Sequence, residues 1–285
     1  MSRADAYLRL GRVSNLPTVW TNVLAGVALS AVRASTGAVM LLALALSLFY
    51  VGGMFLNDAF DRAVDRDQRP ERPIPSGTVS ATEVFATGYA LIAIGVLLVA
   101  RQAPHFGAVA SALGLAAAIV VYDAWHKANP YGPALMATCR FLVYTTAALA
   151  VAGRLERPVI VGAVCLFAYL VGLTYAAKQE TLARLRSLWP LALLVVPLVH
   201  GLPAAAHGAV AAIVYLTLFA AVFCAVWLLR GASPGRFPRA VAVLIAGISL
   251  VDALAIAGAG ASGVAAIAAL GCPLTLALQR FVRGT

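Results

Sequence analysis

The chain has 285 residues, of which 62% are hydrophobic and 11% charged, and its formal net charge is +10. This apolar fraction lies far outside the range of soluble globular proteins and predicts a single membrane domain over residues 1–285. Because the basic residues stand at the ends of apolar segments, the positive charge fits lipid headgroups and membrane orientation, and we expect no binding of nucleic acid.

Ten apolar segments follow one another along the chain, and about 20 apolar residues cross a bilayer as a helix. A helix satisfies all of its backbone polar groups internally, so the pattern predicts an all-α transmembrane bundle of nine to ten membrane-spanning helices. The seventh segment is short and contains Pro190 and Pro197. The predicted segments are Leu16–Val32, Val39–Asn57, Val84–Ala100, Phe106–Tyr122, Pro133–Ala152, Val159–Ala176, Leu188–Val199, Ala209–Leu229, Ala240–Ala257 and Val264–Phe281.

The basic residues are distributed unevenly between the two ends of these segments. If the N-terminus is cytoplasmic and all ten segments cross, sixteen Lys and Arg residues fall on the cytoplasmic side. Four fall on the opposite side, namely Arg33, Arg101, Arg154 and Arg157. Cytoplasmic loops of membrane proteins are enriched in Lys and Arg. The distribution therefore predicts an integral protein of an inner or plasma membrane, with both termini and the end of the second segment in the cytoplasm.

The second segment ends in a group of polar side chains. Asp58 and Asp61 are three residues apart and Asp61 and Asp65 four, so the three carboxylates share one face of a helix. Asn57 reaches the same face at a spacing of four from Asp61. Carboxylates this close repel one another, and Mg²⁺ binds one or two carboxylates together with substrate phosphates. The pattern therefore favours a site for Mg²⁺ and a diphosphate, with these four residues as the metal ligands.

The same residues also fit a solvent-exposed helix end that is stabilised by ion pairs such as Asp58–Arg62 and Asp65–Arg69. Such pairs contribute only ~0.2–0.5 kcal/mol each, which does not offset the repulsion of clustered carboxylates. The chain has only 11 acidic residues, and four of them lie within residues 58–67. We therefore favour the metal site over the solvated helix.

The order Asn-Asp-x-x-Asp-x-x-x-Asp, followed by an Arg- and Pro-rich loop that ends in Ser76-Gly77, resembles the first signature of the UbiA family of intramembrane prenyltransferases. The resemblance implies a UbiA-like helical bundle around a central cavity, with Mg²⁺ and a prenyl diphosphate donor. It implies that Asp58 and Asp61 are catalytic as well as metal-binding. It also makes Asn57 a contact of the substrate.

Two regions outside this motif carry further candidates. Arg69 and Arg72 lie in the loop that caps the cavity mouth in UbiA proteins, and guanidinium groups pair well with phosphate oxygens. An ordinary basic surface loop is the alternative. Asn22 lies inside the first apolar segment, where a buried Asn more often bonds a neighbouring helix. UbiA proteins commonly place an Asn or Arg near here against the donor or acceptor, so Asn22 is a candidate substrate contact.

The junction of the fourth and fifth segments resembles a UbiA element that meets the diphosphate, because Tyr122 is followed five residues later by Lys127. The resemblance implies that Tyr122 contacts the substrate and that Lys127 is a catalytic phosphate ligand, with a topology anchor as the alternative for Lys127. Arg140 lies in mid-span, which costs about 2.5–3.5 kcal/mol on insertion scales. We therefore expect Arg140 to face the substrate cavity or to pair with an acid such as Asp123.

The end of the sixth segment is where UbiA proteins carry a second acidic motif with two Asp. Here the residues are Tyr175, Lys178 and Glu180, and Glu180 is the sole acid. The resemblance implies that these three residues bind the substrate. It also implies that the positive charge of Lys178 or Arg184 replaces a second Mg²⁺ at the diphosphate. A plain interfacial turn is the alternative.

Asp252 is an acid inside an apolar segment, and such residues are functional-site candidates by default. The UbiA family offers no matching motif for it. The ten-segment topology places Asp252 far along a peripheral helix.

The resemblance implies transfer of an isoprenyl group to a small or lipid-like acceptor, while the acceptor and the oligomeric state stay open. The stretch from Tyr122 to Arg140 and the ending Lys178-Gln179-Glu180 are more similar to the divergent EboC-like branch than to the quinone-making enzymes. Because the second acidic motif is incomplete, the alternative is that this protein is a catalytically silent homologue that binds lipid or acts in assembly. A membrane transporter should carry an internal repeat, and the second half has no copy of Asn-Asp-x-x-Asp.

Overall fold

The apolar runs of this chain fold into helices because a helix satisfies every backbone polar group within one segment, as lipid requires. The structure, a computed structural model, describes residues 2–103, 105–126, 129–179, 187, 189–230 and 235–282, and these residues form no strand. Two 3₁₀ segments, Val13–Asn15 and Trp189–Val195, precede α2 and α8. The α-helices are α1 (Arg3–Leu10), α2 (Leu16–Leu29), α3 (Thr36–Gln68), α4 (Ala81–Gln102), α5 (Phe106–Trp125), α6 (Gly132–Ala152), α7 (Arg157–Lys178), α8 (Val196–His207), α9 (Ala209–Leu229), α10 (Arg236–Gly258), α11 (Ser262–Ala269) and α12 (Gly271–Leu278).

Within the described residues, eight helical segments are long and apolar enough to cross a membrane. They are α3 to α7, the continuous segment Trp189–His207, α9 and α10. Two shorter apolar segments, α2 and the pair α11–α12, account for the remaining two of the ten predicted segments. The protein is therefore an integral membrane protein, and the predicted all-α bundle is confirmed.

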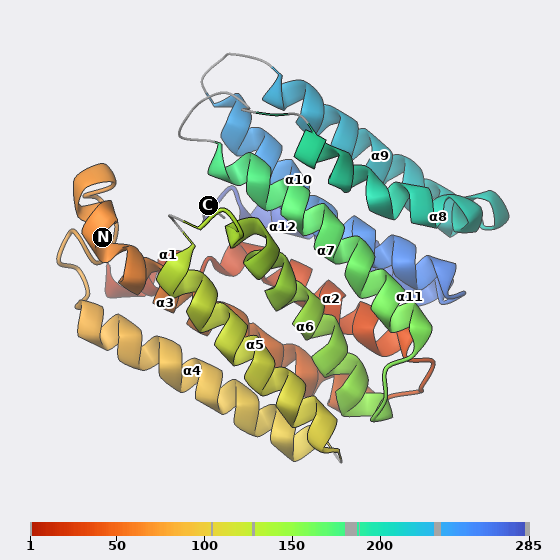
Figure 1. Cartoon of the computed structure of the whole chain (residues 1–285), viewed down its shortest axis with the longest axis horizontal. Helices are drawn as coiled ribbons and strands as arrows, with labels where there is room; N and C mark the ends of the chain where they lie inside the picture. Colours follow the sequence, from red (N-terminus) through yellow and green to blue (C-terminus); the bar gives the residue numbers. More distant parts are fainter. Residues whose placement is uncertain are drawn as a thin grey trace.

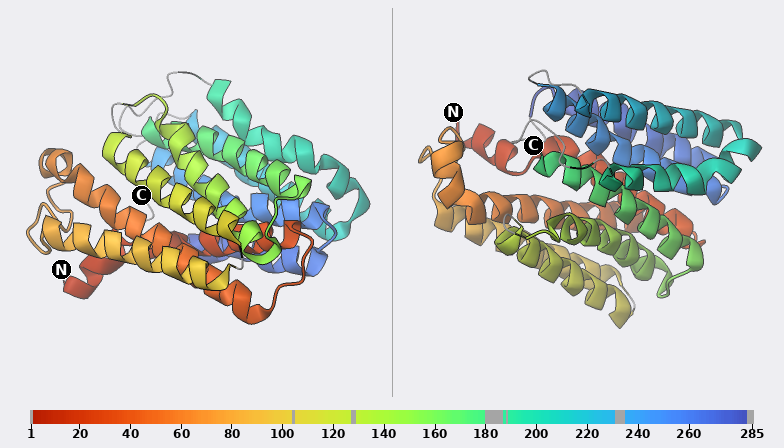
Figure 2. Two further views of the ribbon diagram at one scale, coloured as in Figure 1. Left: turned by 60° about the horizontal axis from the view of Figure 1, so that its bottom comes forward. Right: turned by 45° about the horizontal axis from the view of Figure 1, so that its top comes forward.

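The bundle has two halves that meet at α2 and α6 (Figure 1). In one half, α3, α4 and α5 pack around buried side chains such as Leu46, Phe49 and Leu115. In the other half, α7 to α10 pack around a core that includes Tyr169 and Leu244. Figure 2 shows the two groups of helices lying on either side of α2 and α6.

The polar ends of α3, α5 and α7 lie at one end of the bundle, together with the two ends of the described chain. The side-chain amide of Gln279, after α12, donates a hydrogen bond of 3.0 Å to Oδ1 of Asn15, before α2. α1 packs its buried Ala6 and Leu10 against Phe55 of α3. The functional site is built at this end.

Two predicted segments differ in the structure. The seventh was expected to be short, but Trp189–His207 is a continuous helical segment of 19 residues. Pro197 lies in the first turn of α8, where its missing N–H has no helical partner to lose. The segment containing Asp252 was expected to be peripheral, and this prediction is wrong. α10 packs on α2, α7, α8, α9, α11 and α12, and most of its residues are buried.

Candidate active site

The acidic motif lies on the last turns of α3. The helix continues through the motif to Gln68 and ends just before Pro70, whose ring disfavours helical geometry in the residue before it. The side chains of Asn57, Asp58, Asp61 and Asp65 are all buried on this helix. The predicted shared face is confirmed, and the solvated helix end is wrong because none of these four residues is exposed.

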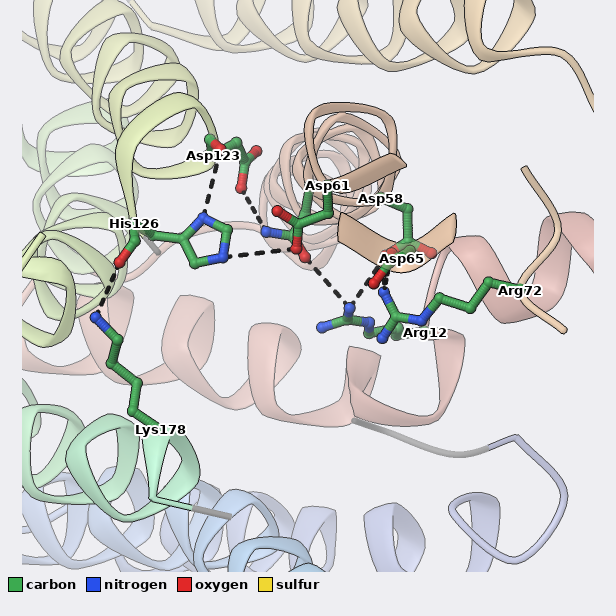
Figure 3. Close-up of polar contacts among 9 residues, drawn as sticks. Arg12, Asp58, Asp61, Asp65, Arg72, Asp123, His126 and Lys178 are labelled. Carbon is green, nitrogen blue, oxygen red and sulfur yellow. Dashed lines mark hydrogen bonds and ion pairs between the residues drawn. The ribbon is translucent and has the colours of Figure 1, made fainter. Parts of the chain in front are cut away.

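Two arginines from outside α3 face the motif (Figure 3). Arg12 Nη2 donates to Asn57 Oδ1 at 3.3 Å and to Asp58 Oδ1 at 3.2 Å. Arg72 Nη1 donates to Asp58 Oδ1 at 3.3 Å and to Asp65 Oδ2 at 2.8 Å. Arg72 therefore lies against the acidic motif, and its contact with a substrate stays a prediction. Arg69 is exposed at the end of α3.

Arg12 was not among the predicted site residues, although the structure gives it two marks of a functional position. Its backbone adopts left-handed angles (φ 41°), which cost energy in a non-glycine residue and concentrate at functional sites. Burial disfavours its charge, but the facing carboxylate of Asp58 together with Tyr50 and Tyr122 outweighs this and raises the pKa of Arg12 above its ordinary value. Arg12 is therefore a fixed positive charge against the acidic motif.

The end of α5 closes the other side of the motif (Figure 3). Asn57 Nδ2 donates to Asp123 Oδ1 at 3.1 Å, and His126 Nε2 lies 3.6 Å from Asp61 Oδ2. Tyr122, a predicted site residue, stacks on the ring of His126 with centroids 4.9 Å apart. Asp123 Oδ2 is buried and has no hydrogen-bond partner among the described residues. Asp123 was not predicted at this site, although an acid closing an apolar segment is the same signal that Asp58 gives.

The end of α7 does not reach the acids in the way the resemblance implied. Lys178 Nζ donates to the backbone carbonyl oxygens of His126 and Asn129, both at 2.9 Å. The hydroxyl of Tyr175 accepts a hydrogen bond from the backbone N–H of Ser187 at 3.0 Å. Lys178 thus holds the loop between α5 and α6. The predicted site residues Lys127 and Glu180 lie outside the described residues.

A second polar cluster is buried deeper in the bundle, around Asp252 of α10. Its carboxylate accepts hydrogen bonds from Thr21 Oγ1 at 2.5 Å, Asn22 Nδ2 at 2.7 Å and the Tyr144 hydroxyl at 2.5 Å. Asp252, Asn22 and Tyr144 are fully buried. The cluster joins α2, α6 and α10 where the two halves of the bundle meet.

Arg140 of α6 extends this cluster toward the acidic motif. Its guanidinium group donates to Asn22 Oδ1 at 2.7 Å and to Thr18 Oγ1 at 3.1 Å, and lies 5.4 Å from the ring centre of Tyr50. The expected pairing of Arg140 with Asp123 is wrong, because residue 140 faces α2 while Asp123 bonds to α3. Both ends of the Asn22 amide are engaged within the bundle, and its contact with a substrate stays a prediction.

The donor atoms at the acidic motif suit a hard divalent cation. Carboxylate and amide oxygens are the ligands that Mg²⁺ prefers, and the unpartnered Asp123 Oδ2 adds another to those of α3. In the described part of the chain, no three acidic, His or Cys side chains converge closely enough to hold a metal ion. The guanidinium groups of Arg12 and Arg72 instead neutralise Asp58 and Asp65. The residues thus fit Mg²⁺ by chemistry, with phosphate oxygens completing the shell.

Comparison with known proteins gives one family. A model of the UbiA prenyltransferase family matches residues 17–262. The fold resembles that of an apo UbiA homologue from Aeropyrum pernix, with a TM-score of 0.65, 19% identity, and coverage of 85% of this chain and 96% of the other. It also resembles a UbiA homologue from Archaeoglobus fulgidus solved with GPP and Mg²⁺, with a TM-score of 0.61, 16% identity and coverage of 90% and 99%.

Curated relatives match a shorter region. Digeranylgeranylglyceryl phosphate synthase of Ignicoccus hospitalis is 40% identical over 112 residues, which are 37% of this chain and 34% of that protein. The protein of the same name from Methanopyrus kandleri is 36% identical over 99 residues, 34% of this chain and 36% of that protein. The matched region thus spans about a third of the length of these relatives. The EboC-like branch stays a prediction.

Proposed function

Because the chain belongs to the UbiA prenyltransferase family over residues 17–262, we propose that it transfers a prenyl group from a prenyl diphosphate to a lipid-like acceptor within the membrane. One observation carries the proposal. Three carboxylates and an amide lie buried on one face of α3, at the end of a membrane helix, with two arginines against them. Family members with Mg²⁺ and GPP support a diphosphate as the ligand of such a face.

The residues of the site divide the work of holding the donor. Asp58, Asp61 and Asp65 would hold Mg²⁺, with Asn57 assisting them, and the ion would supply positive charge to the departing pyrophosphate. With Mg²⁺ at these carboxylates, Arg12 and Arg72 would be free to bind phosphate oxygens, with which guanidinium groups form strong paired hydrogen bonds.

The apolar bundle around the site protects the reaction. The prenyl carbon–oxygen bond breaks, and the allylic carbon forms its new bond with the acceptor, which loses a proton. Exclusion of water prevents hydrolysis of the allylic group. The relatives named digeranylgeranylglyceryl phosphate synthase support a lipid-like acceptor. The uneven distribution of basic residues supports a cytoplasmic position for the site.

The test is release of pyrophosphate from geranylgeranyl diphosphate by the purified protein in lipid nanodiscs, with membrane lipid extract as the source of acceptor. We expect Mg²⁺-dependent release and a prenylated lipid detectable by mass spectrometry. The double variant Asp58→Asn/Asp61→Asn should lose both this activity and Mg²⁺-dependent binding of a donor analogue, because the metal loses two of its carboxylates. Asp67→Asn is the matched control, since Asp67 is exposed on the last turn of the same helix.

A second candidate, a UbiA homologue without catalytic activity, is favoured by the position of Lys178. This residue stands where the family's second acidic motif is expected, and it bonds to loop carbonyl groups instead. A catalytically silent homologue, which binds lipid or acts in assembly, would release no pyrophosphate with any acceptor fraction. Equal binding of the donor analogue by wild type and the double variant would contradict the proposed role of the α3 carboxylates in holding the donor.

A further inference from the structure

The end of α7 carries few acidic residues that could bind a cation on the far side of the proposed diphosphate site. From Tyr175 to Arg186 the chain contains one acidic residue, Glu180. Lys178, at the end of the helix, is committed to the carbonyl oxygens of His126 and Asn129. A cation on this side of a diphosphate therefore needs an acid from another element.

Asp123 is an acid that reaches the motif from a different helix. It stands near the end of α5 and lies beside the α3 face, joined to it by the hydrogen bond from Asn57 (Figure 3). Only 3% of its surface is exposed, and its Oδ2 has no hydrogen-bond partner among the described residues. An unpartnered carboxylate oxygen in such a place is costly unless a ligand or ion satisfies it.

The surrounding charges point to a cation as that partner. Asp58 and Asp61 are close enough to Asp123 for their charges to repel its own. Arg12 and Arg72 bond to Asp58 and Asp65. The Oδ2 atom of Asp123 has no hydrogen-bond partner among the described residues. A buried carboxylate oxygen beside other carboxylates is unfavourable, and a divalent ion supplies the partner that it lacks.

The end of α5, which carries Asp123, and the loop that follows it are held in place from two directions. The His126 ring is 3.6 Å from Asp61 through Nε2, and its Nδ1 lies 3.4 Å from the backbone carbonyl oxygen of Asp123. Lys178 fixes the same loop from α7. The lysine in the eroded motif therefore positions the end of α5 against α3.

We propose that Asp123 replaces the missing acidic motif of α7, and that it binds a second divalent cation together with Asp61 and the diphosphate of the donor. The proposal rests on the proposed function, because the diphosphate completes the ligand set. No three Asp, Glu, His or Cys side chains among the described residues lie close enough together to hold a metal ion. We therefore expect this cation to bind with the diphosphate and not before it.

The experiment counts bound Mn²⁺ by electron paramagnetic resonance in protein loaded with geranylgeranyl S-thiolodiphosphate, which is not turned over. Wild type should hold two Mn²⁺ per chain and Asp123→Asn one. Asp67→Asn should hold two, because it removes the same charge from an exposed position on α3. The asparagine at 123 still accepts a hydrogen bond from Asn57, so it keeps any positioning role and removes only the negative charge.

Two Mn²⁺ in Asp123→Asn would overturn the proposal and leave Asp123 as a positioning residue for Asn57. One Mn²⁺ in wild type would overturn it while leaving the proposed function intact. Failure of wild type to bind the analogue in the presence of Mn²⁺ would instead contradict the proposed function. Anomalous diffraction from Mn²⁺ in wild-type crystals with the same analogue requires no variant, and absence of a Mn²⁺ peak at Asp123 would also overturn the proposal.

Discussion

At the scale of single residues, the buried carboxylates differ in the kinds of partner that they meet. Asp58 and Asp65 meet guanidinium groups, Asp61 meets His126, and Asp252 accepts three neutral hydrogen bonds. A buried carboxylate is stable only when it is paired, so the type of partner indicates the role of each acid. The guanidinium partners at the α3 face are charged and replaceable by a metal ion. Those of Asp252 are fixed parts of three helices.

This difference predicts a structural role for Asp252. Asp252→Ala removes an acceptor of Thr21, Asn22 and Tyr144. The Asn22 amide and the Tyr144 hydroxyl then lose their bond to the carboxylate, while Thr21 keeps the backbone oxygen of Thr18 as an acceptor. Interhelical hydrogen bonds in membranes contribute about 0.6–2 kcal/mol each, so the loss of three predicts a loss of roughly 2–6 kcal/mol in stability. Tyr144→Phe removes one bond and should cost roughly 1 kcal/mol. The measurement is thermal unfolding of the detergent-solubilised protein, and equal melting temperatures for wild type and Asp252→Ala would contradict the role.

At the scale of elements, the contact between α3 and α4 depends on glycine. A Cβ atom at Gly52 would lie 2.7 Å from the backbone oxygen of Gly88 and 2.9 Å from Ile92 Cγ1. Small residues at membrane-helix interfaces let backbones approach closely. This close approach orients α3, and the orientation of α3 decides where its carboxylates point.

Gly52→Ala should therefore destabilise the bundle and weaken donor binding, because the α4 backbone must move to admit the methyl group. Gly37→Ala is the matched control in the same helix, since a Cβ there meets nothing within 4 Å. Alanine is about 1 kcal/mol better than glycine inside a helix, so the control should be neutral or slightly more stable. Thermal unfolding and affinity for the thiolodiphosphate analogue measure both effects. A Gly52→Ala protein as stable as Gly37→Ala would show that the two helices are not constrained at this contact.

At the scale of the whole molecule, the bundle brings both ends of the described chain to the face that carries the acids. Gln279 after α12 bonds to Asn15 before α2, so the described chain begins and ends on one side. Ten apolar segments agree with an even number of crossings. The excess of Lys and Arg predicts that this side is cytoplasmic.

Reporter fusions test the orientation. A fluorescent protein fused after Thr285 should fold in the cytoplasm and fluoresce. Alkaline phosphatase fused after Gly153, in the turn between α6 and α7, should be active on the opposite side. Phosphatase activity from a fusion at Thr285 would mean an odd number of crossings, and α11–α12 would then not span.

The sequence alone determined the class of the fold and half of the site. Apolar runs of about 20 residues leave the backbone no stable choice in lipid but a helix. The spacing of Asn57, Asp58, Asp61 and Asp65 fixed their common face, because helical periodicity is a local property. These predictions needed no knowledge of which helices touch.

Only the tertiary structure decided which residues meet that face. Arg12 and Asp123 come from segments far from α3 in the chain, and no local spacing relates them to it. Arg140 was assigned the wrong partner for the same reason, since the rotation of α6 against α2 is set by packing across the whole bundle. Asp252 was placed at the periphery because chain order does not reveal that α10 packs at the centre. Pairings between helices depend on close packing of many side chains at once, and a single sequence does not determine them.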